Sequence, residues 1–163
     1  MNNNVQPIPE GYNTVTPFII VKNAEKAIEF YKKAFKAEER YRLYGTDNKT
    51  IMHAEIIIGN SPIMLTEEFL DMKCLAPTTI GGNPTWFYVY VKDVDSFFDN
   101  AISAGAKIVE PVQDAFWGDR FGSLKDPFGH QWSIATHKKD LSLDEIKKGS
   151  EEFCAKMSKN RKE

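Results

Sequence analysis

The strongest constraint on the fold of this chain is an internal repeat: one order of strand and helix signals occurs twice within its 163 residues. In each half, a run of β-branched and aromatic residues ends at a short polar segment, which is followed by an amphipathic helix pattern and three more strand signals. The segment 21–25, Val-Lys-Asn-Ala-Glu, matches the segment 91–95, Val-Lys-Asp-Val-Asp. A β-α-β-β-β unit that is used twice predicts two small modules that share a core and curve around a common cleft.

The residue pattern sets the expected bounds of these elements. The first module is expected to contain strands over 14–21, 38–44, 50–58 and 62–66 and a helix that begins after Asn23; the second is expected to contain strands over 86–91, 107–112, 121–125 and 130–136 and a helix between Asp93 and Gly105. Ser142 and Glu145 have capping-box spacing and predict a C-terminal helix. The expected organisation is a leader over 1–13, modules over 14–70 and 85–138, a linker over 71–84 between them, and a C-terminal helix with its tail over 139–163. The fold class is α+β, with a curved mixed sheet around a cleft.

The stretch 116–137 reads as two strands joined by a tight turn at 126–129, Asp-Pro-Phe-Gly. The proline presets its own φ angle and the glycine tolerates a left-handed backbone, as such a turn requires. In the returning strand, Trp132 and Ile134 alternate with small or polar residues, so one face is apolar and the other is not. A small, polar face beside Trp117 suits a cleft for a small molecule. An ordinary hairpin over a core fits the same pattern.

Composition argues against several classes of function. The formal net charge of −2 argues against a nucleic-acid partner, because phosphate binding needs a strong basic excess. The longest apolar runs, 17–21 and 56–58, have the length of strands and predict no membrane span. The first residues lack the basic and apolar regions of a secretion signal, so a cytoplasmic location is expected. Cys74 and Cys154 lie far apart in no metal-ligand spacing, which favours reduced, incidental thiols.

Several motifs resemble the vicinal oxygen chelate superfamily, which includes glyoxalase I, extradiol dioxygenases, fosfomycin-resistance enzymes and bleomycin-resistance proteins. They are the paired strand-helix starts, the segment 28–31 (Ile-Glu-Phe-Tyr) and the closing segment 126–130 (Asp-Pro-Phe-Gly-His), and the likeness covers residues 14–137. The segments 52–55 (Met-His-Ala-Glu) and 117–120 (Trp-Gly-Asp-Arg) resemble the glyoxalase-like proteins labelled PhnB-like. The resemblance implies the fold. It does not fix the activity, because this fold carries several chemistries.

In metal-dependent members of this superfamily, one side chain from each of four strands binds a divalent cation. Matched position by position, the resemblance places these sites at Thr16 and Trp86 in the module-opening strands and at Met64 and Ser133 in the module-closing strands. A thioether, an indole and two neutral hydroxyls cannot replace imidazoles and carboxylates. We therefore expect no metal and no other cofactor at the usual place. Without the cation and its carboxylate ligands, the glyoxalase I mechanism loses its Lewis acid and its base together.

A displaced catalytic or metal site is the alternative. His53 and Glu55 lie two residues apart on an expected strand and so share one face, and His130 or His137 could approach them from the second module. Such a pair could act as acid and base, or help to hold one divalent metal ion, in a glyoxalase-like isomerase or lyase or in a dioxygenase. An exposed His and Glu on a polar face, or at a dimer contact, is the simpler interpretation. Whether the protein is an enzyme is left open.

An aromatic and polar lining remains at the expected cleft. The candidate ligand-binding residues are Thr16, Phe18, Met64, Trp86, Tyr88, Tyr90, Trp117, Arg120 and Ser133. This lining favours stacking on a flat, partly polar organic molecule without a metal, although core filling would also account for the aromatic residues. Arg120 could pair with an anionic group of the ligand, or with Asp119 or Glu110. The leading prediction is a small-molecule-binding protein similar to the bleomycin-resistance proteins. The resemblance also implies a homodimer, because two-module relatives usually complete their clefts by pairing.

Overall fold

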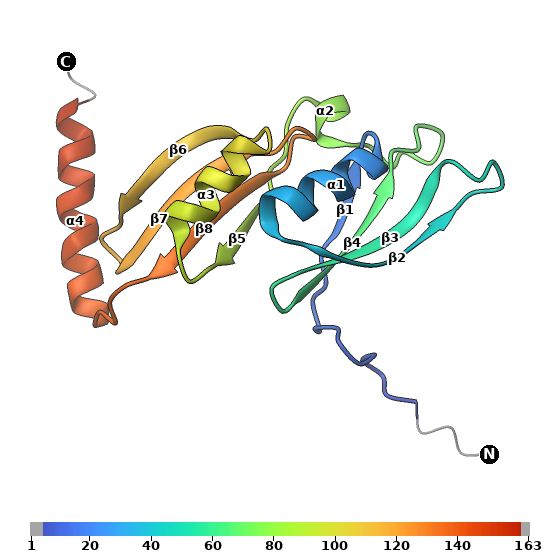
Figure 1. Cartoon of the computed structure of the whole chain (residues 1–163). Coiled ribbons are helices and arrows are strands. Elements are labelled where there is room, and N and C mark those ends of the chain that lie inside the picture. Colours follow the sequence, from blue (N-terminus) through green and yellow to red (C-terminus); the bar gives the residue numbers. More distant parts are fainter. Residues whose placement is uncertain (1–4, 161–163) are drawn as a thin grey trace.

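The computed structural model describes residues 5–160 and has the expected α+β architecture of two βαβββ modules (Figure 1). The first module consists of β1 (Phe18–Val21), α1 (Ala24–Phe35), β2 (Glu38–Tyr44), β3 (Ile51–Ile58) and β4 (Ser61–Glu67). The second consists of β5 (Trp86–Tyr90), α3 (Val94–Ser103), β6 (Lys107–Asp114), β7 (Asp119–Lys125) and β8 (Gln131–His137). Between the modules lies α2 (Pro77–Ile80), and α4 (Leu143–Asn160) follows them. Residues 1–4 of the expected leader and 161–163 of the expected tail lie outside the described residues.

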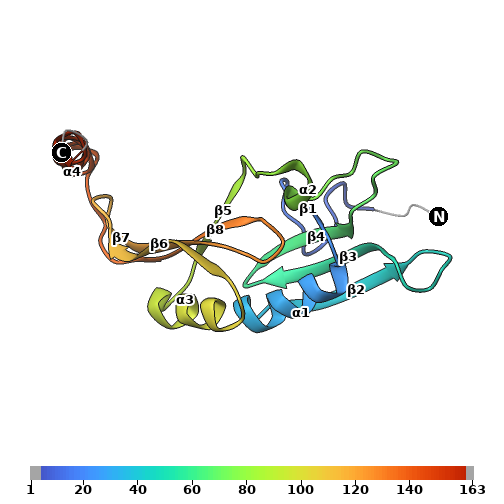
Figure 2. The ribbon, with the colours of Figure 1, turned by 90° about the horizontal axis from the view of Figure 1, so that it is seen from above.

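Each module forms one four-stranded mixed sheet. The strand order is β1-β4-β3-β2 in the first sheet and β5-β8-β7-β6 in the second. In each, the first strand of the module runs parallel to its neighbour and the other pairs are antiparallel. The two sheets lie side by side, with α1 and α3 on the same side of them (Figures 1 and 2). Each sheet therefore has one face covered by a helix and one face that α1 and α3 leave uncovered.

The module helices begin at the residues that the sequence predicts. Asn23, at φ 65°, and Asp93 each accept a hydrogen bond from a backbone N–H in the first helical turn. The two helices then contact each other, and the rings of Phe35 and Phe97 stack with their centroids 5.8 Å apart. This contact joins the modules on the covered side of the sheets.

The closing hairpin ties the two modules together through a buried carboxylate. Asp126 accepts hydrogen bonds from the Tyr31 hydroxyl at 2.8 Å and from the Trp132 indole N–H at 2.9 Å. Its other oxygen accepts the backbone N–H groups of Phe128 and His130, so the first residue of the predicted turn also holds the turn closed. Burial, together with the neighbouring Asp126 charge, raises the pKa of Tyr31 well above its ordinary value. The buried carboxylate is stable here because its oxygens all find donors.

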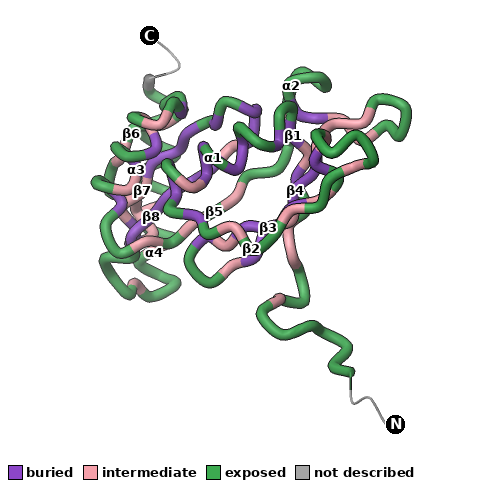
Figure 3. Tube along the Cα trace, turned by 45° about the vertical axis from the view of Figure 1, so that its right-hand side comes forward, coloured by how far each residue is buried: buried purple, intermediate pink, exposed green. Residues whose placement is uncertain are grey.

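Burial differs between the two faces of each sheet. Buried segments run through α1 and the central strands in the middle of the molecule, whereas the N-terminal segment and α4 are largely exposed (Figure 3). On β8, Trp132 and Ile134 are fully buried on the face that α3 covers, as their alternation predicts. Ser133 points the other way and is also buried, and its hydroxyl is satisfied by a hydrogen bond of 3.0 Å with the hydroxyl of Ser123 on β7. Large exposed side chains on the uncovered faces include Phe18 in the first sheet and Trp86, Tyr88 and Tyr90 in the second.

The C-terminal helix α4 lies at the far end of the second sheet, on the side opposite α3 (Figures 1 and 2). The predicted capping box is confirmed: the N–H and hydroxyl of Ser142 donate to the Glu145 carboxylate, and the Glu145 N–H donates back to the hydroxyl. A Cβ at Gly149 would lie 2.9 Å from Cβ of Phe116, so the glycine lets the helix approach the β6–β7 connection closely. No helix in the described part of the chain is both long and apolar enough to cross a membrane.

Candidate functional site

Three aromatic side chains line the uncovered face of the second sheet along its edge strand. Strand alternation directs Trp86, Tyr88 and Tyr90 to this face, and they are 47%, 45% and 63% exposed. The rings of Tyr88 and Tyr90 lie with their centroids 5.1 Å apart. The core aromatic residues Trp132 and Phe35, by contrast, are almost completely buried. Core filling therefore does not account for the three residues of β5.

A buried carboxylate fixes the orientation of two of these rings. Asp119 is 3% exposed, and its Oδ2 accepts hydrogen bonds from the hydroxyls of Tyr88 at 3.2 Å and Tyr90 at 3.0 Å and from the Trp117 indole N–H at 3.0 Å. Its Oδ1 lies 2.8 Å from Nδ1 of His137. Burial disfavours the charged form, but the bonds from His137 and the aromatic donors outweigh it and hold the pKa of Asp119 below its ordinary value. The carboxylate is thus an ionised anchor for the aromatic face.

The imidazole of His137 extends this network towards α4. Its Nδ1 faces Asp119, and its Nε2 lies 3.0 Å from Oδ1 of Asp140, which precedes the helix. Hydrogen bonds to Asp119 and then to Asp140 raise the pKa of His137. An imidazolium can donate to both carboxylates at once, so the protonated form fits this arrangement best.

The first sheet carries another buried carboxylate on its uncovered face. Glu55 is 1% exposed and accepts hydrogen bonds from the hydroxyls of Tyr12 and Tyr41, the latter at 2.6 Å. Arg40 lies 3.4 Å from one of its oxygens and Nε2 of His53 lies 3.3 Å from the other. Burial opposes ionisation, but these partners, Tyr12 first, hold the pKa of Glu55 below its ordinary value. The expectation of an exposed glutamate on a polar face is therefore wrong.

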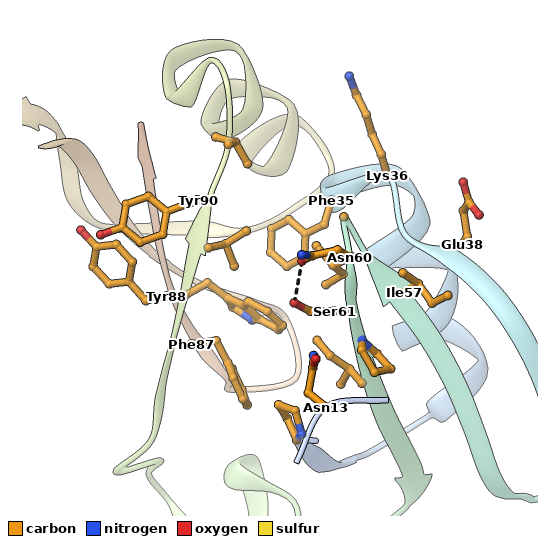
Figure 4. A pocket seen from close by; sticks show the side chains of 18 of the residues that line it. Asn13, Phe35, Lys36, Glu38, Ile57, Asn60, Ser61, Phe87, Tyr88 and Tyr90 are labelled. Carbon is orange, nitrogen blue, oxygen red and sulfur yellow. Dashed lines mark hydrogen bonds between the residues drawn. The ribbon is translucent and has the colours of Figure 1, made fainter. Parts of the chain in front are cut away.

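A cavity of ≈ 610 Å³ lies at the junction of the two sheets. Figure 4 shows the rings of Tyr88 and Tyr90 on one side of β5 and that of Phe87 on the other, so this junction cavity reaches around the edge of the strand. Lys36 after α1 and Asn60 in the β3–β4 turn contribute to the opposite wall. Because β5 pairs with β8 alone among the described strands, the backbone groups on its other edge can hydrogen-bond to a bound molecule.

The residues at the four positions equivalent to the metal ligands of related enzymes do not fit a divalent cation. The Thr16 hydroxyl donates to a backbone carbonyl, and the Ser133 hydroxyl is engaged by a neighbouring serine. Met64 and Trp86 offer no carboxylate oxygen or imidazole nitrogen, which such cations require. Across residues 5–160, no group of three or more His, Cys, Asp or Glu side chains is arranged to hold a metal ion.

Two more of the candidate ligand-binding residues lie on an uncovered face of a sheet, and a third, Arg120, does not. Phe18 and Met64 are direct neighbours on β1 and β4, on the uncovered face of the first sheet. Arg120 directly follows Asp119 on β7, so its side chain points to the opposite face. There it pairs with Asp95 of α3 at 2.7 Å, instead of with either carboxylate that the sequence favours. The structure therefore removes Arg120 from the candidate lining.

Neither histidine of the second module joins the pair formed by His53 and Glu55. His130 is buried, and its Nε2 lies 3.0 Å from the backbone carbonyl oxygen of Ile20. His137 belongs to the other carboxylate network. The displaced site that the sequence suggests is thus reduced to the histidine and glutamate of β3.

The sequence does not indicate the anchoring role of the two buried carboxylates, nor two of the donors to Glu55. The sequence places Asp119 beside the expected cleft and offers it as a partner for Arg120, and its pattern singles out neither Tyr12 nor Tyr41. For Asp119, strand alternation offers a signal, because it places this residue on the same face of the strand as Phe121, two residues later. No comparable pattern exists for Tyr12, which lies in the irregular leader.

Comparison with known proteins supports the fold. A family model described as the Glyoxalase/Bleomycin resistance protein/Dioxygenase superfamily matches residues 11–134. An uncharacterised protein from Mycobacterium tuberculosis is 40% identical over 146 residues, which cover 88% of this chain and 82% of that relative. The crystal structure of TioX from Micromonospora sp. ML1 superimposes with a TM-score of 0.61 at 27% identity and covers 77% of this chain and 98% of TioX. A PhnB protein from Bacillus cereus, at 20% identity and a TM-score of 0.57 over 76% of this chain and 99% of its own, shares the fold.

Proposed function

Because the chain belongs to the glyoxalase/bleomycin resistance protein/dioxygenase superfamily, we propose that it binds a small, flat and partly polar organic molecule in the junction cavity, against Tyr88 and Tyr90. The observation that carries this proposal is a cavity of ≈ 610 Å³ whose wall is an edge strand with aromatic side chains on both sides. Typical ligand pockets have volumes of roughly 300–1,000 Å³ and combine apolar walls with a few polar groups. Flat rings with a polar edge would stack on the aromatic side chains and hydrogen-bond to the free backbone edge.

The carboxylate network supports binding because it orders the aromatic rings before a ligand arrives. Asp119 holds the hydroxyls of both tyrosines, so neither ring has to be immobilised by the ligand. Ordering a mobile side chain on binding costs roughly 0.5–1.5 kcal/mol. The proposed binding requires no metal ion, which agrees with the donor chemistry at the four equivalent positions.

We further propose that the protein acts as a homodimer, since members of this superfamily commonly form dimers and bind small molecules. Phe18 and Trp86 expose large apolar side chains on neighbouring sheets, and exposed surfaces of this kind mark contact sites. A second copy would cover the uncovered faces and exclude water from the rings. Light scattering coupled to size-exclusion chromatography tests this proposal, and a monomer at micromolar concentration would contradict it.

A thermal-shift screen of flat heteroaromatic compounds, followed by calorimetric titration of the hits, tests ligand binding. Tyr88→Ala is expected to weaken binding of a hit at least about tenfold, because it removes a stacking partner from the cavity wall. Tyr44→Ala is the matched control, since Tyr44 is similarly exposed but lies on β2, outside the junction cavity. Weaker binding in Trp86→Ala as well would extend the contact over the uncovered face. Unchanged binding in Tyr88→Ala would refute the placement of the ligand.

A metal-dependent lyase, isomerase or dioxygenase that uses His53 and Glu55 is the second candidate. The 3.3 Å separation between the imidazole Nε2 and the carboxylate oxygen favours it. The other donors around Glu55 oppose it, because they already occupy both carboxylate oxygens. Metal analysis of the purified protein separates the two candidates: stoichiometric metal and a chelator-dependent loss of thermal stability are expected only for the enzyme.

A further inference from the structure

A second cavity, of ≈ 620 Å³, lies between α4 and the adjoining part of the second sheet. Its walls include four aromatic residues, Phe116, Trp117, Phe121 and Phe153. This helix cavity shares no lining residue with the junction cavity. It also depends on a helix that lies beyond residues 11–134, the part of the chain that matches the family. The proposed function therefore does not account for it.

The position of α4 is fixed by close contacts with the second module. Gly149 admits the helix against Phe116, whose ring lies 5.6 Å from that of Phe153 between centroids. The segment that leads to the helix passes over Gly118. The backbone carbonyl of Gly118 accepts hydrogen bonds from the N–H groups of Lys138 and Lys139, at 3.0 Å each. A Cβ at Gly118 would clash with the Lys139 carbonyl oxygen. The helix is thus seated at two points, and the space beside it is a defined feature of the fold.

The aromatic walls of the helix cavity are ordered by contacts with one another. The rings of Phe116 and Trp117 meet edge to face at 5.0 Å, and those of Trp117 and Phe121 lie 4.8 Å apart. The indole N–H of Trp117 is held by Asp119. Ring faces carry negative electrostatic potential and attract cations.

Carboxylates outnumber cationic side chains around this cavity. Glu110, Asp114 and Glu152 line it, against Lys156 alone. Glu110 accepts a hydrogen bond from Gln113 at 2.6 Å, and an arginine pairs with Asp114 at 3.3 Å. Glu152, one turn before the lysine, takes part in none of the ion pairs within residues 5–160 and is available to a ligand.

We infer that the helix cavity is a second binding site, which takes a flat aromatic cation such as a protonated heteroaromatic amine. The ring would stack among the aromatic walls, with Phe153 as the wall supplied by α4. The positive charge would lie towards Glu152 and the acidic side of the cavity. Both parts of this inference, the ring and the charge, follow from the lining residues and can be tested separately.

The test uses 9-aminoacridine, a fluorescent flat cation, and acridine-9-carboxylate, an anion with the same ring system. Titration of the full chain, followed by dye fluorescence and quenching of tryptophan, is expected to show saturable binding of the cation that depends on Phe153, and binding of the anion weaker by about tenfold or more. Phe153→Ala should weaken binding of the cation about tenfold, and Glu152→Gln about threefold to tenfold.

Matched controls come from the same helix. Met157→Ala removes an exposed apolar side chain and Glu151→Gln removes an exposed charge, and neither residue lines the cavity. Both variants should bind the cation as the wild type does. Asn60→Ala, which alters the wall of the junction cavity from the first module, should also leave this affinity unchanged, so failure of the proposed function is distinguishable from failure of this inference. No saturable binding, equal binding of the anion, or loss of binding in Asn60→Ala but not in Phe153→Ala would each overturn the inference.

Discussion

Replacing Asp119 should loosen the aromatic face of the second sheet and lower the stability of the whole domain. The side chain accepts hydrogen bonds from Tyr88, Tyr90 and Trp117 and contacts His137. A hydrogen bond to a charged group contributes about 1.5–3 kcal/mol when its donor is withdrawn from water, and less when the donor is half exposed. We count about 1.5 kcal/mol for the hydrogen bond from the indole and about 0.5–1 kcal/mol for that from each tyrosine. Asp119→Ala is therefore expected to lower the free energy of unfolding by about 3 kcal/mol.

The isosteric variant Asp119→Asn separates geometry from charge. Its carbonyl oxygen can still accept from the tyrosines and the indole, while its amide can face an unprotonated His137. We expect a loss of only about 1 kcal/mol, because neutral hydrogen bonds replace charged ones.

A pH series adds an independent readout. The pKa of His137 is raised in the folded protein, so its contribution to stability is complete below the ordinary value of 6.5 and is lost as the pH rises through the folded value. The free energy of unfolding of the wild type should therefore fall as the pH rises from 6.5 through the raised pKa of His137. This fall should be smaller in Asp119→Asn.

Urea unfolding followed by tryptophan fluorescence, at about pH 6 and about pH 8, measures both effects, and near-UV circular dichroism reports the order of the tyrosines. Equal stabilities of the alanine and asparagine variants would refute the role of the carboxylate as an acceptor. An Asp119→Ala variant within about 0.5 kcal/mol of the wild type would refute the anchoring argument altogether.

Three other perturbations test the fold and the site. Tyr31→Phe should destabilise the protein by about 1–3 kcal/mol in urea unfolding, because it removes a buried donor from Asp126; a change below about 0.5 kcal/mol would contradict the role of that bond. Gly149→Ala should speed tryptic cleavage within α4, because the added Cβ displaces the helix from Phe116 although alanine is the better helix former by about 1 kcal/mol; an unchanged cleavage rate would show that the close approach is not required. Incubation with a chelator should leave the melting temperature unchanged if binding needs no metal, and a clear fall would favour the metal-dependent alternative.

The elements of the fold were predictable because local signals agree with the tertiary packing. The caps at Asn23 and Asp93 and the Asp-Pro-Phe-Gly turn at 126–129 act within a few residues of themselves, so they can be read from the sequence alone. The first strand begins at Phe18 rather than at residue 14. The short helix α2 was not expected, because four residues in a Pro- and Gly-containing linker carry no helical period.

The candidate site was less predictable, because it depends on contacts between distant residues. Once the strand is known, alternation directs Asp119 and Arg120 to opposite faces of the sheet. Arg120 is thereby excluded from the candidate lining, although the sequence presents the two residues together. The contact of Tyr12 with Glu55 joins residues 43 positions apart, across an irregular leader, and has no local signature. The lining of the helix cavity likewise depends on where α4 docks, which its own amphipathic pattern does not specify.

The two carboxylates that are buried on the uncovered faces order surface tyrosines and do not fill the core. Glu55 and Asp119 lie in different modules, yet each is almost fully buried and each accepts hydrogen bonds from two tyrosine hydroxyls. Burying an ionised carboxylate costs several kcal/mol, and well-packed apolar residues often stabilise a fold as well or better. Stability alone therefore does not explain charged groups at these positions. Their physical effect is to hold tyrosine rings in fixed orientations on surfaces that no helix of their own module covers. We infer that this effect, and not a contribution to the core, is the role of both carboxylates.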